Sequence, residues 1–162
     1  MKLRKLEKKD ASLMLEWMHD ATVTEKLHNN FWSKTIDDCE DFIKLAQNTE
    51  RDIHLAVVDN EDIYMGTVSL KHITDKDAEF AIVIRACAKG KGYANYAMKE
   101  IIHIAFRELK LARVFWCVSP ENIVALRFYD KNGYQRFSMT GEESIKGYTK
   151  EQIDYYVWYD VQ

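Results

Sequence analysis

Residues 78–109 read AEFAIVIRACAKGKGYANYAMKEIIHIAFREL, and this stretch decides the fold. Ala78–Arg85 is an apolar run typical of a strand, and Tyr93–Leu109 repeats small and apolar side chains at helical spacing. Lys89–Gly92 lies between them and predicts a loop. A loop that enters a helix presents unpaired N–H groups, and its glycines let an anion approach the backbone. The six residues from Lys89 favour an anion site and a plain loop with solvated lysines about equally.

The charge around this loop favours an anionic ligand. Arg85, Lys89 and Lys91 are three cations in a chain whose net charge is −3. The loop lacks the GxxxxGK[ST] pattern of a P-loop, and Asn95 stands where a dinucleotide fingerprint GxGxxG needs its last glycine. These two kinds of nucleotide site are therefore excluded.

The composition bounds the class of protein. The chain has 162 residues, of which 47% are hydrophobic and 30% charged, as in an ordinary soluble domain. No apolar run approaches the ~18 residues of a membrane span, and the opening MKLRKLEKKD is not a secretory signal. The near-neutral charge argues against general nucleic-acid binding. We expect a cytoplasmic protein that binds neither membrane nor nucleic acid.

Cysteine and histidine usage predicts neither disulfides nor metal. The cysteines are odd in number and far apart in sequence, which fits a reducing compartment, and the histidines show no zinc-ligand spacing. These residues are Cys39, Cys87 and Cys117, and His19, His28, His54, His72 and His103.

The rest of the chain alternates between strand-like and helix-like patterns. Further strands are predicted at Met1–Leu6, Ile53–Asp59, Tyr64–Lys71, Arg113–Val118, Tyr134–Phe137 and Ile153–Tyr159. Further helices are predicted after the N-caps Asp10 and Thr35 and over Asn122–Asn132, which Gly133 ends. We predict one domain over residues 1–162, a mixed α/β sheet around one long crossover helix.

A second motif follows the strand at Arg113–Val118. Asn122 opens a helix that carries Ala125 and Tyr129, and Gly133-Tyr134 ends it. Each residue alone has an ordinary structural explanation, as a cap, a core aromatic or a helix stop.

Together the two motifs resemble the GNAT superfamily of acyl-coenzyme A-dependent N-acetyltransferases. Lys89-Gly90-Lys91-Gly92-Tyr93-Ala94 is similar to that family's pyrophosphate loop, and the motif from Asn122 to Tyr134 is similar to its later signature. AEFAIVI, VSPEN, RFYDKNGY and the tail IKGYTKEQIDYYVWY resemble the branch of ribosomal-protein-alanine and spermidine acetyltransferases. Lys89 replaces the usual Gln or Arg, and Ala86 stands where a Pro is common.

The resemblance implies a fold and a donor site. The fold is a mixed, mostly antiparallel sheet of about seven strands with flanking helices, in which the strands ending at Ile84 and Val118 splay apart. Acetyl-CoA is the implied co-substrate, with no metal. The implied donor-binding residues are Ile82, Val83 and Ile84 along the pantetheine arm, Lys89, Gly90, Lys91, Gly92, Tyr93, Ala94 and Asn95 at the pyrophosphate, and Asn122 and Tyr129.

The resemblance also implies a mechanism. The acetyl group passes to a primary amine of a small molecule or a protein N-terminus through a tetrahedral intermediate. Tyr129 is the expected general acid, since a phenol is protonated at neutral pH, and the Ile84 amide is the expected donor to the thioester carbonyl. Glu79 is one candidate base, but strand alternation puts it on the face of Ala81 and Val83, so a structural ion pair is equally expected.

The acceptor pocket is expected between the irregular Thr22–Ser33 segment and the Gly141–Tyr148 loop. Phe31, Trp32 and Tyr148 are its expected wall residues, although Trp32 fits an ordinary core position slightly better. Glu25 and His72 are weaker candidates for the base. The resemblance further implies a possible homodimer.

Two alternatives remain beside the enzyme. One is a catalytically silent domain of the same fold that binds acyl-CoA, which a turnover assay would distinguish. The other is a cysteine enzyme that uses Cys117 or Cys87, which the apolar surroundings of Cys117 disfavour.

Overall fold

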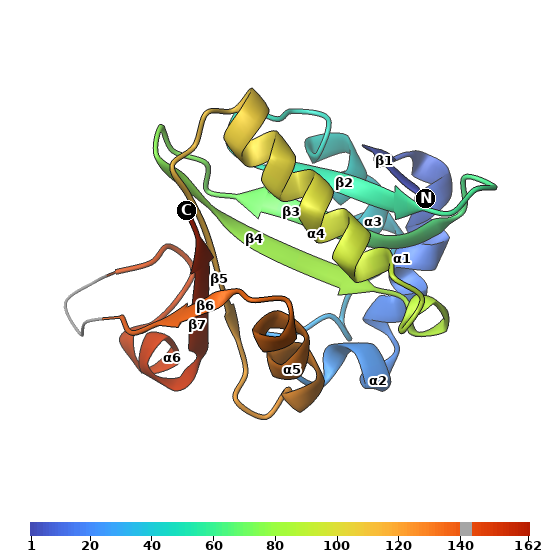
Figure 1. The fold of residues 1–162 in the computed structure, drawn as a ribbon. Helices are drawn as coiled ribbons and strands as arrows, with labels where there is room; N and C mark the ends of the chain where they lie inside the picture. Colours follow the sequence, from blue (N-terminus) through green and yellow to red (C-terminus); the bar gives the residue numbers. More distant parts are fainter. Residues whose placement is uncertain (140–143) are drawn as a thin grey trace.

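The computed structural model describes residues 1–139 and 144–162, in which seven strands form one sheet (Figure 1). Their order across the sheet is β1-β2-β3-β4-β5-β7-β6. The strands are β1 (Lys2–Lys5), β2 (Ile53–Val58), β3 (Tyr64–Lys71), β4 (Asp77–Ile84), β5 (Arg113–Val118), β6 (Gln135–Phe137) and β7 (Val157–Val161). All neighbouring strands are antiparallel except β4 and β5. The prediction of a mixed, mostly antiparallel sheet is confirmed.

Helices cover both faces of this sheet (Figure 1). They are η1 (Lys8–Asp10), α1 (Ala11–Met18), α2 (Ala21–Thr24), α3 (Ile36–Leu45), η2 (Ala86–Ala88), α4 (Tyr93–His103), η3 (Ile104–Glu108), α5 (Ile123–Lys131) and α6 (Lys150–Tyr155). The α4 helix crosses one face, and α1 and α3 lie on the other. No helix in residues 1–139 and 144–162 is long and apolar enough to cross a membrane.

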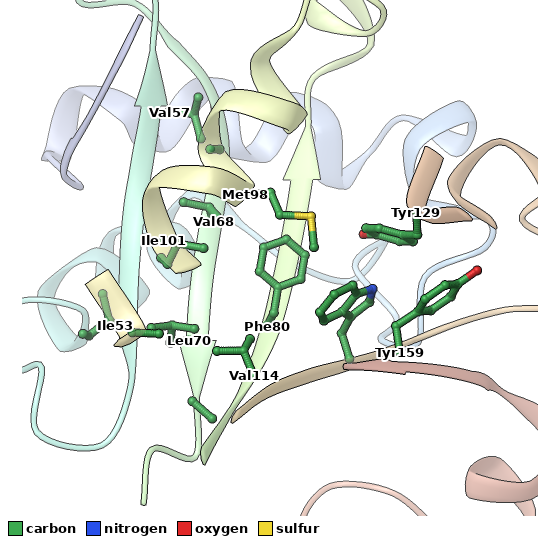
Figure 2. Close-up of a cluster of buried hydrophobic side chains, with 14 of the residues drawn as sticks. Ile53, Val57, Val68, Leu70, Phe80, Met98, Ile101, Val114, Tyr129 and Tyr159 are labelled. Atoms are coloured by element: carbon green, nitrogen blue, oxygen red, sulfur yellow. The ribbon is translucent and has the colours of Figure 1, made fainter. Parts of the chain in front are cut away.

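The α4 face holds the larger core (Figure 2). Met98 and Ile101 of α4 pack against Val68, Leu70 and Phe80 of the sheet, and this cluster continues to Tyr129 and Tyr159. The predicted helix over Tyr93–Leu109 begins at the expected residue, but its last part, η3, is π-helical. On the opposite face, α1 and α3 bury a second core that includes Met14, Trp17 and Ile43.

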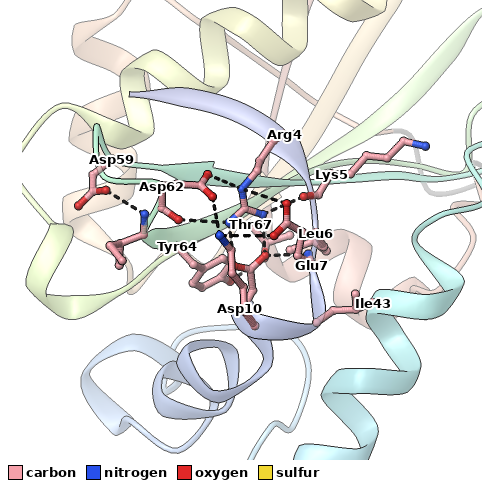
Figure 3. Close-up of polar contacts among 12 residues, drawn as sticks. Arg4, Lys5, Leu6, Glu7, Asp10, Ile43, Asp59, Asp62, Tyr64 and Thr67 are labelled. Carbon is pink, nitrogen blue, oxygen red and sulfur yellow. Dashed lines mark hydrogen bonds and ion pairs between the residues drawn. The ribbon is translucent and has the colours of Figure 1, made fainter.

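A buried carboxylate ties β1 to the second core (Figure 3). Both guanidinium NH₂ groups of Arg4 donate to Asp10, at 2.8 and 2.9 Å, and Arg4 Nε donates to Asp62 at 2.7 Å. The Glu7 amide also donates to Asp10 at 2.8 Å. Asp10 is the N-cap residue of α1, as predicted, but its side chain makes no capping hydrogen bond because its oxygens accept from Arg4 and Glu7.

The predicted last strand, Ile153–Tyr159, is wrong in its first half. Thr149 Oγ1 accepts from the Gln152 amide and the Gln152 side chain accepts from the Thr149 amide, and this capping box starts α6. The strand begins only at Val157, and it lies between β5 and β6.

Candidate active site

The central parallel pair separates after a short contact, and this opens the sheet. β4 and β5 pair only over Asp77–Glu79 and Arg113–Phe115. Beyond Glu79, β4 continues to Ile84 alongside β3, while β5 continues to Val118 alongside β7. Figure 1 shows the two strands diverging toward the loop before α4 and toward α5. The splay expected from the family resemblance is present.

The backbone of β4 presents two unpaired residues to this gap. The Arg85 amide donates to the Met65 carbonyl at 2.9 Å, so odd-numbered residues of β4 direct their N–H and C=O groups toward β3. Ile82 and Ile84 therefore direct theirs toward the gap. The backbone groups of Val83 are directed toward β3, where Val83 pairs with Thr67. Of the three residues expected along the pantetheine, Ile82 and Ile84 therefore have backbone groups free on the gap side, and Val83 does not.

The loop at the wide end of the gap fits a phosphate group. Gly90 and Gly92 have φ values of 74° and 89°, and a Cβ at either position would meet nothing within 4 Å. Gly92 is also the N-cap of α4, so the N-cap residue has no side chain that could bond to the amides of the first turn. Within the described residues, the N–H groups of residues 90–95 make no hydrogen bond. These open amides at a helix N-terminus can bind a diphosphate.

Two of the three nearby cations are directed elsewhere. Arg85 donates to Glu16, with both N–O distances 3.1 Å, and to the Tyr64 carbonyl at 3.0 Å. Lys89 Nζ donates to the Thr22 carbonyl at 3.2 Å, which joins the loop to α2. The Lys91 side chain is exposed at the loop. The groups of this loop that remain available to an anion are therefore its backbone amides and Lys91.

Asn122 and Tyr129 lie on the other side of the gap, on α5. Asn122 caps the helix by accepting from the Ala125 amide at 3.2 Å. Tyr129 packs beside Trp116, with ring centroids 5.2 Å apart, and Figure 2 shows its hydroxyl pointing toward Met98 and β4. Burial raises the pKa of Tyr129 above its ordinary value, which keeps the phenol protonated at neutral pH.

Glu79 belongs to a buried polar cluster on the opposite face of the sheet. Its side chain is 2% exposed, and the Tyr148 hydroxyl donates to Oε2 at 2.8 Å. Lys71 Nζ lies 3.7 Å from Oε2, and His72 Nδ1 lies 3.6 Å from Oε1. Cys117 Sγ donates to the Tyr148 hydroxyl at 3.3 Å. Burial raises the pKa of this thiol to about 12, so it is protonated and a poor nucleophile.

The two segments expected to form the acceptor pocket meet at His28. The His28 ring stacks on Tyr148 at 4.6 Å, and its Nε2 lies 3.3 Å from the Gly147 carbonyl oxygen. Gly141, at the start of the expected loop, lies outside the described residues.

The other residues expected at the acceptor pocket differ in burial: one packs on a core and two are exposed. Phe31 packs edge-on against Trp17 at 4.9 Å and belongs to the second core. Trp32 is 57% exposed and stacks on His19, so the core interpretation of Trp32 is wrong. Glu25 is exposed at the C-terminal end of α2.

Sequence reasoning missed three members of the Glu79 cluster: His28, Lys71 and Cys117. The pairing of Lys71 with Glu79 follows from hairpin register and could have been found by counting back from the turn. The contacts of His28 and Cys117 with Tyr148 depend on the path of the chain after β6 and carry no local signal. In the described part of the chain, no group of His, Cys, Asp and Glu side chains is arranged to hold a metal.

The splayed strand pair and the loop of open amides define the class, that of acyltransferases with a coenzyme A thioester as donor. A family model described as "Acetyltransferase (GNAT) domain" matches residues 1–135. The chain therefore belongs to the GNAT acetyltransferase family.

Individual relatives agree with this membership. The spermidine N(1)-acetyltransferase of Escherichia coli K12 is 30% identical over 149 residues, covering 88% of this chain and 75% of that protein. Acetyltransferase PseH of Campylobacter jejuni is 27% identical over 133 residues, covering 80% and 79%. A crystal structure of spermidine N-acetyltransferase from Vibrio cholerae in complex with CoA and spermine has a TM-score of 0.77 at 22% identity, covering 98% of this chain and 92% of that one. This last similarity supports the fold.

Proposed function

We propose that the protein transfers an acetyl group from acetyl-CoA to a primary amine by direct attack. The observation that carries the proposal is the gap between β4 and β5, which has the backbone groups of Ile82 and Ile84 on one side and Tyr129 on the other. The open amides of residues 90–95 lie at its wide end, where the diphosphate of coenzyme A would bind. The amine class is supported by the relative named as a spermidine N(1)-acetyltransferase.

The reaction assigns a role to each side of the gap. The amine nitrogen forms a bond to the thioester carbon, and the carbonyl oxygen takes the negative charge, which the Ile84 amide stabilises by donating a hydrogen bond. Collapse of this intermediate breaks the carbon–sulfur bond, and Tyr129 protonates the leaving thiolate. Asn122 holds the start of α5 beside the pantetheine.

The base that takes the amine proton is a separate assignment. Glu79 is one candidate, acting through water, but Tyr148 and Lys71 already engage its Oε2. An ion-pair role in the structure therefore competes with a role as base. A pH–rate profile that is the same in Glu79→Gln and in the native chain would remove Glu79 from the mechanism.

The decisive test is turnover with acetyl-CoA and a panel of amines: spermidine, spermine, an amino sugar and a peptide with a free N-terminus. Tyr129→Phe should lower kcat by roughly 100-fold or more, as expected for loss of a positioned acid. The dissociation constant of acetyl-CoA should change little, because the phenol acts on the leaving group. Tyr134→Phe on the neighbouring ring is the matched control.

Two results would contradict the proposal. Unchanged kcat in Tyr129→Phe would remove Tyr129 as the acid. Acetyl-CoA binding without acetylation of any amine on the panel would favour a silent acyl-CoA-binding module.

A further inference from the structure

Tyr148 contacts both strands at the point where they separate. Glu79 is the last residue of β4 that pairs with β5, and its partner is Phe115. Cys117 follows two positions later on β5, on the same face of the sheet because side chains alternate. The Tyr148 hydroxyl donates to Glu79 at 2.8 Å and accepts from Cys117 at 3.3 Å. The Tyr148 hydroxyl therefore connects β4 and β5 at the point where they stop pairing, on the face of the sheet opposite α4.

This hydroxyl is the hydrogen-bond donor to a buried carboxylate. Glu79 Oε1 is buried and has no hydrogen-bond partner among the described residues. Lys71 and His72 lie at ion-pair distances of 3.7 and 3.6 Å, beyond hydrogen-bond length. Removing the hydroxyl would leave Glu79 buried without a hydrogen bond, a strongly unfavourable state.

The ring of Tyr148 joins this vertex to both neighbouring segments. It stacks on His28 of the 22–33 segment at 4.6 Å and packs edge-on against Trp158 of β7 at 5.4 Å. His28 also contacts the Gly147 carbonyl oxygen. Tyr148 thus links both segments expected at the acceptor side to the point where the strands separate.

We propose that Tyr148 is a positioning residue that fixes the acceptor side of the site relative to the splayed strands. This inference rests on the proposed function. The donor side, made of the loop at residues 89–95 and α5, contains none of these contacts. Loss of the Tyr148 hydroxyl should therefore weaken use of the amine and leave use of acetyl-CoA intact.

The test measures steady-state constants for both substrates in Tyr148→Phe, which keeps the ring and removes the hydroxyl. The KM of the amine should rise about 10-fold or more, because the segments at the acceptor side lose their hydrogen bond to Glu79 and shift relative to the strands. The KM of acetyl-CoA should stay within about 2-fold. Tyr156→Phe is the matched control. It removes a hydroxyl 3.4 Å from His28 Nδ1, in the same cluster, that does not contact Glu79, and both KM values should be unchanged.

A second variant keeps the inference testable if Tyr148→Phe does not fold. His28→Leu alters a half-buried ring and removes its stacking on Tyr148, while the bond to Glu79 stays. It should raise the KM of the amine selectively, and retained thermal stabilisation by acetyl-CoA shows that the variant is folded.

Three outcomes separate the possibilities. An active native chain with equal changes in both KM values, or no change, in Tyr148→Phe overturns this inference alone. A Tyr156→Phe variant that matches Tyr148→Phe also overturns it. A native chain that binds acetyl-CoA but acetylates no amine overturns the proposed function, and this inference with it.

Discussion

A single hydrogen atom at position 66 lets β3 and β4 approach one another beside the gap. Gly66 of β3 pairs with Ile84, and a Cβ built on it would lie 2.3 Å from the Val83 carbonyl oxygen and 3.1 Å from the Ile84 Cα. Both neighbours are backbone atoms of the strand that borders the site. The backbone position of Ile84, which the proposed mechanism uses, therefore depends on the absence of a side chain across from it.

Gly66→Ala should destabilise the fold, because the added methyl forces β3 and β4 apart. Overpacking of this kind costs about 1–3 kcal/mol, which urea unfolding followed by tryptophan fluorescence can measure. An unfolding free energy equal to that of the native chain would show that the strands separate without strain. Gly90→Ala is a useful comparison, because its methyl would meet nothing within 4 Å. Any loss of stability in this variant would come from the positive φ alone.

The loop and the first turn of α4 act as one element. Gly92 adopts a φ of 89° as the N-cap, a conformation that a β-branched residue rarely takes. The start of α4, and with it the place of the open amides, depends on this conformation. Donor binding should therefore depend on Gly92 more than on the lysine charges, of which Lys89 is already bound to Thr22.

Acetyl-CoA at about 100 times its Kd should stabilise the native chain by about 2.7 kcal/mol. For a chain of this size the Tm should rise by roughly 5–10 °C. The shift should disappear in Gly92→Val and persist in Lys89→Met. A full shift in Gly92→Val would mean that the donor binds elsewhere.

The sequence predicted most elements because their signals are local. Thr35 and Asp38 form the capping box that starts α3, and Gly133 ends the α5 region with a φ of 80°. The start of α6 was missed because the alternation of Tyr155, Val157 and Tyr159 suggested a strand, whereas Thr149 and Gln152 cap a helix turn before it.

The site was predictable only where it lies on continuous chain. The proposed roles of Gly90, Gly92 and Tyr129 come from short motifs. The Glu79–Tyr148 bond joins residues separated by 69 positions, and it exists because β7 inserts between β5 and β6 and draws the preceding segment across the sheet. The hydrophobic periodicity of the sequence indicates on which face of a strand or helix a side chain lies. It does not indicate which distant segment packs over that face.

The whole molecule should be most stable between about pH 7 and pH 8. Burial lowers the pKa of His54 and raises that of Cys117, so the unfolded chain gains a proton on His54 below about pH 6.5 and loses one from Cys117 above about pH 8.5. Lys9 and Arg4 hold the pKa of Asp62 at about 2, and hydrogen bonds lower the pKa values of Asp38 and Asp130. Lowered carboxyl pKa values add stability above the unfolded pKa of about 4, which is lost as the pH falls through the folded values. Burial raises the pKa values of Tyr64 and Tyr129, whose contribution is lost as the pH rises above about 10.

Urea unfolding at a series of pH values measures both limbs of this profile. Asp62→Asn should flatten the acid limb, and Asp75→Asn, on an exposed turn, should leave it unchanged. An acid limb that is identical in the native chain and Asp62→Asn would show that acid stability does not depend on the Arg4–Asp62 contact in Figure 3 or on the contact of Asp62 with Lys9.

The strand order also determines the sequence in which strands can pair while the chain is being synthesised. β6 pairs with β7 alone, and β7 is translated after residues 138–156. At a synthesis rate of about 5–20 residues per second, the strands β1 to β4 can pair with one another before β7, the partner of β6, has been synthesised. The segment that carries Tyr148 and β7 is thus assembled last, and a ribosome stalled before residue 157 would hold β5 and β6 without the strand that pairs with both.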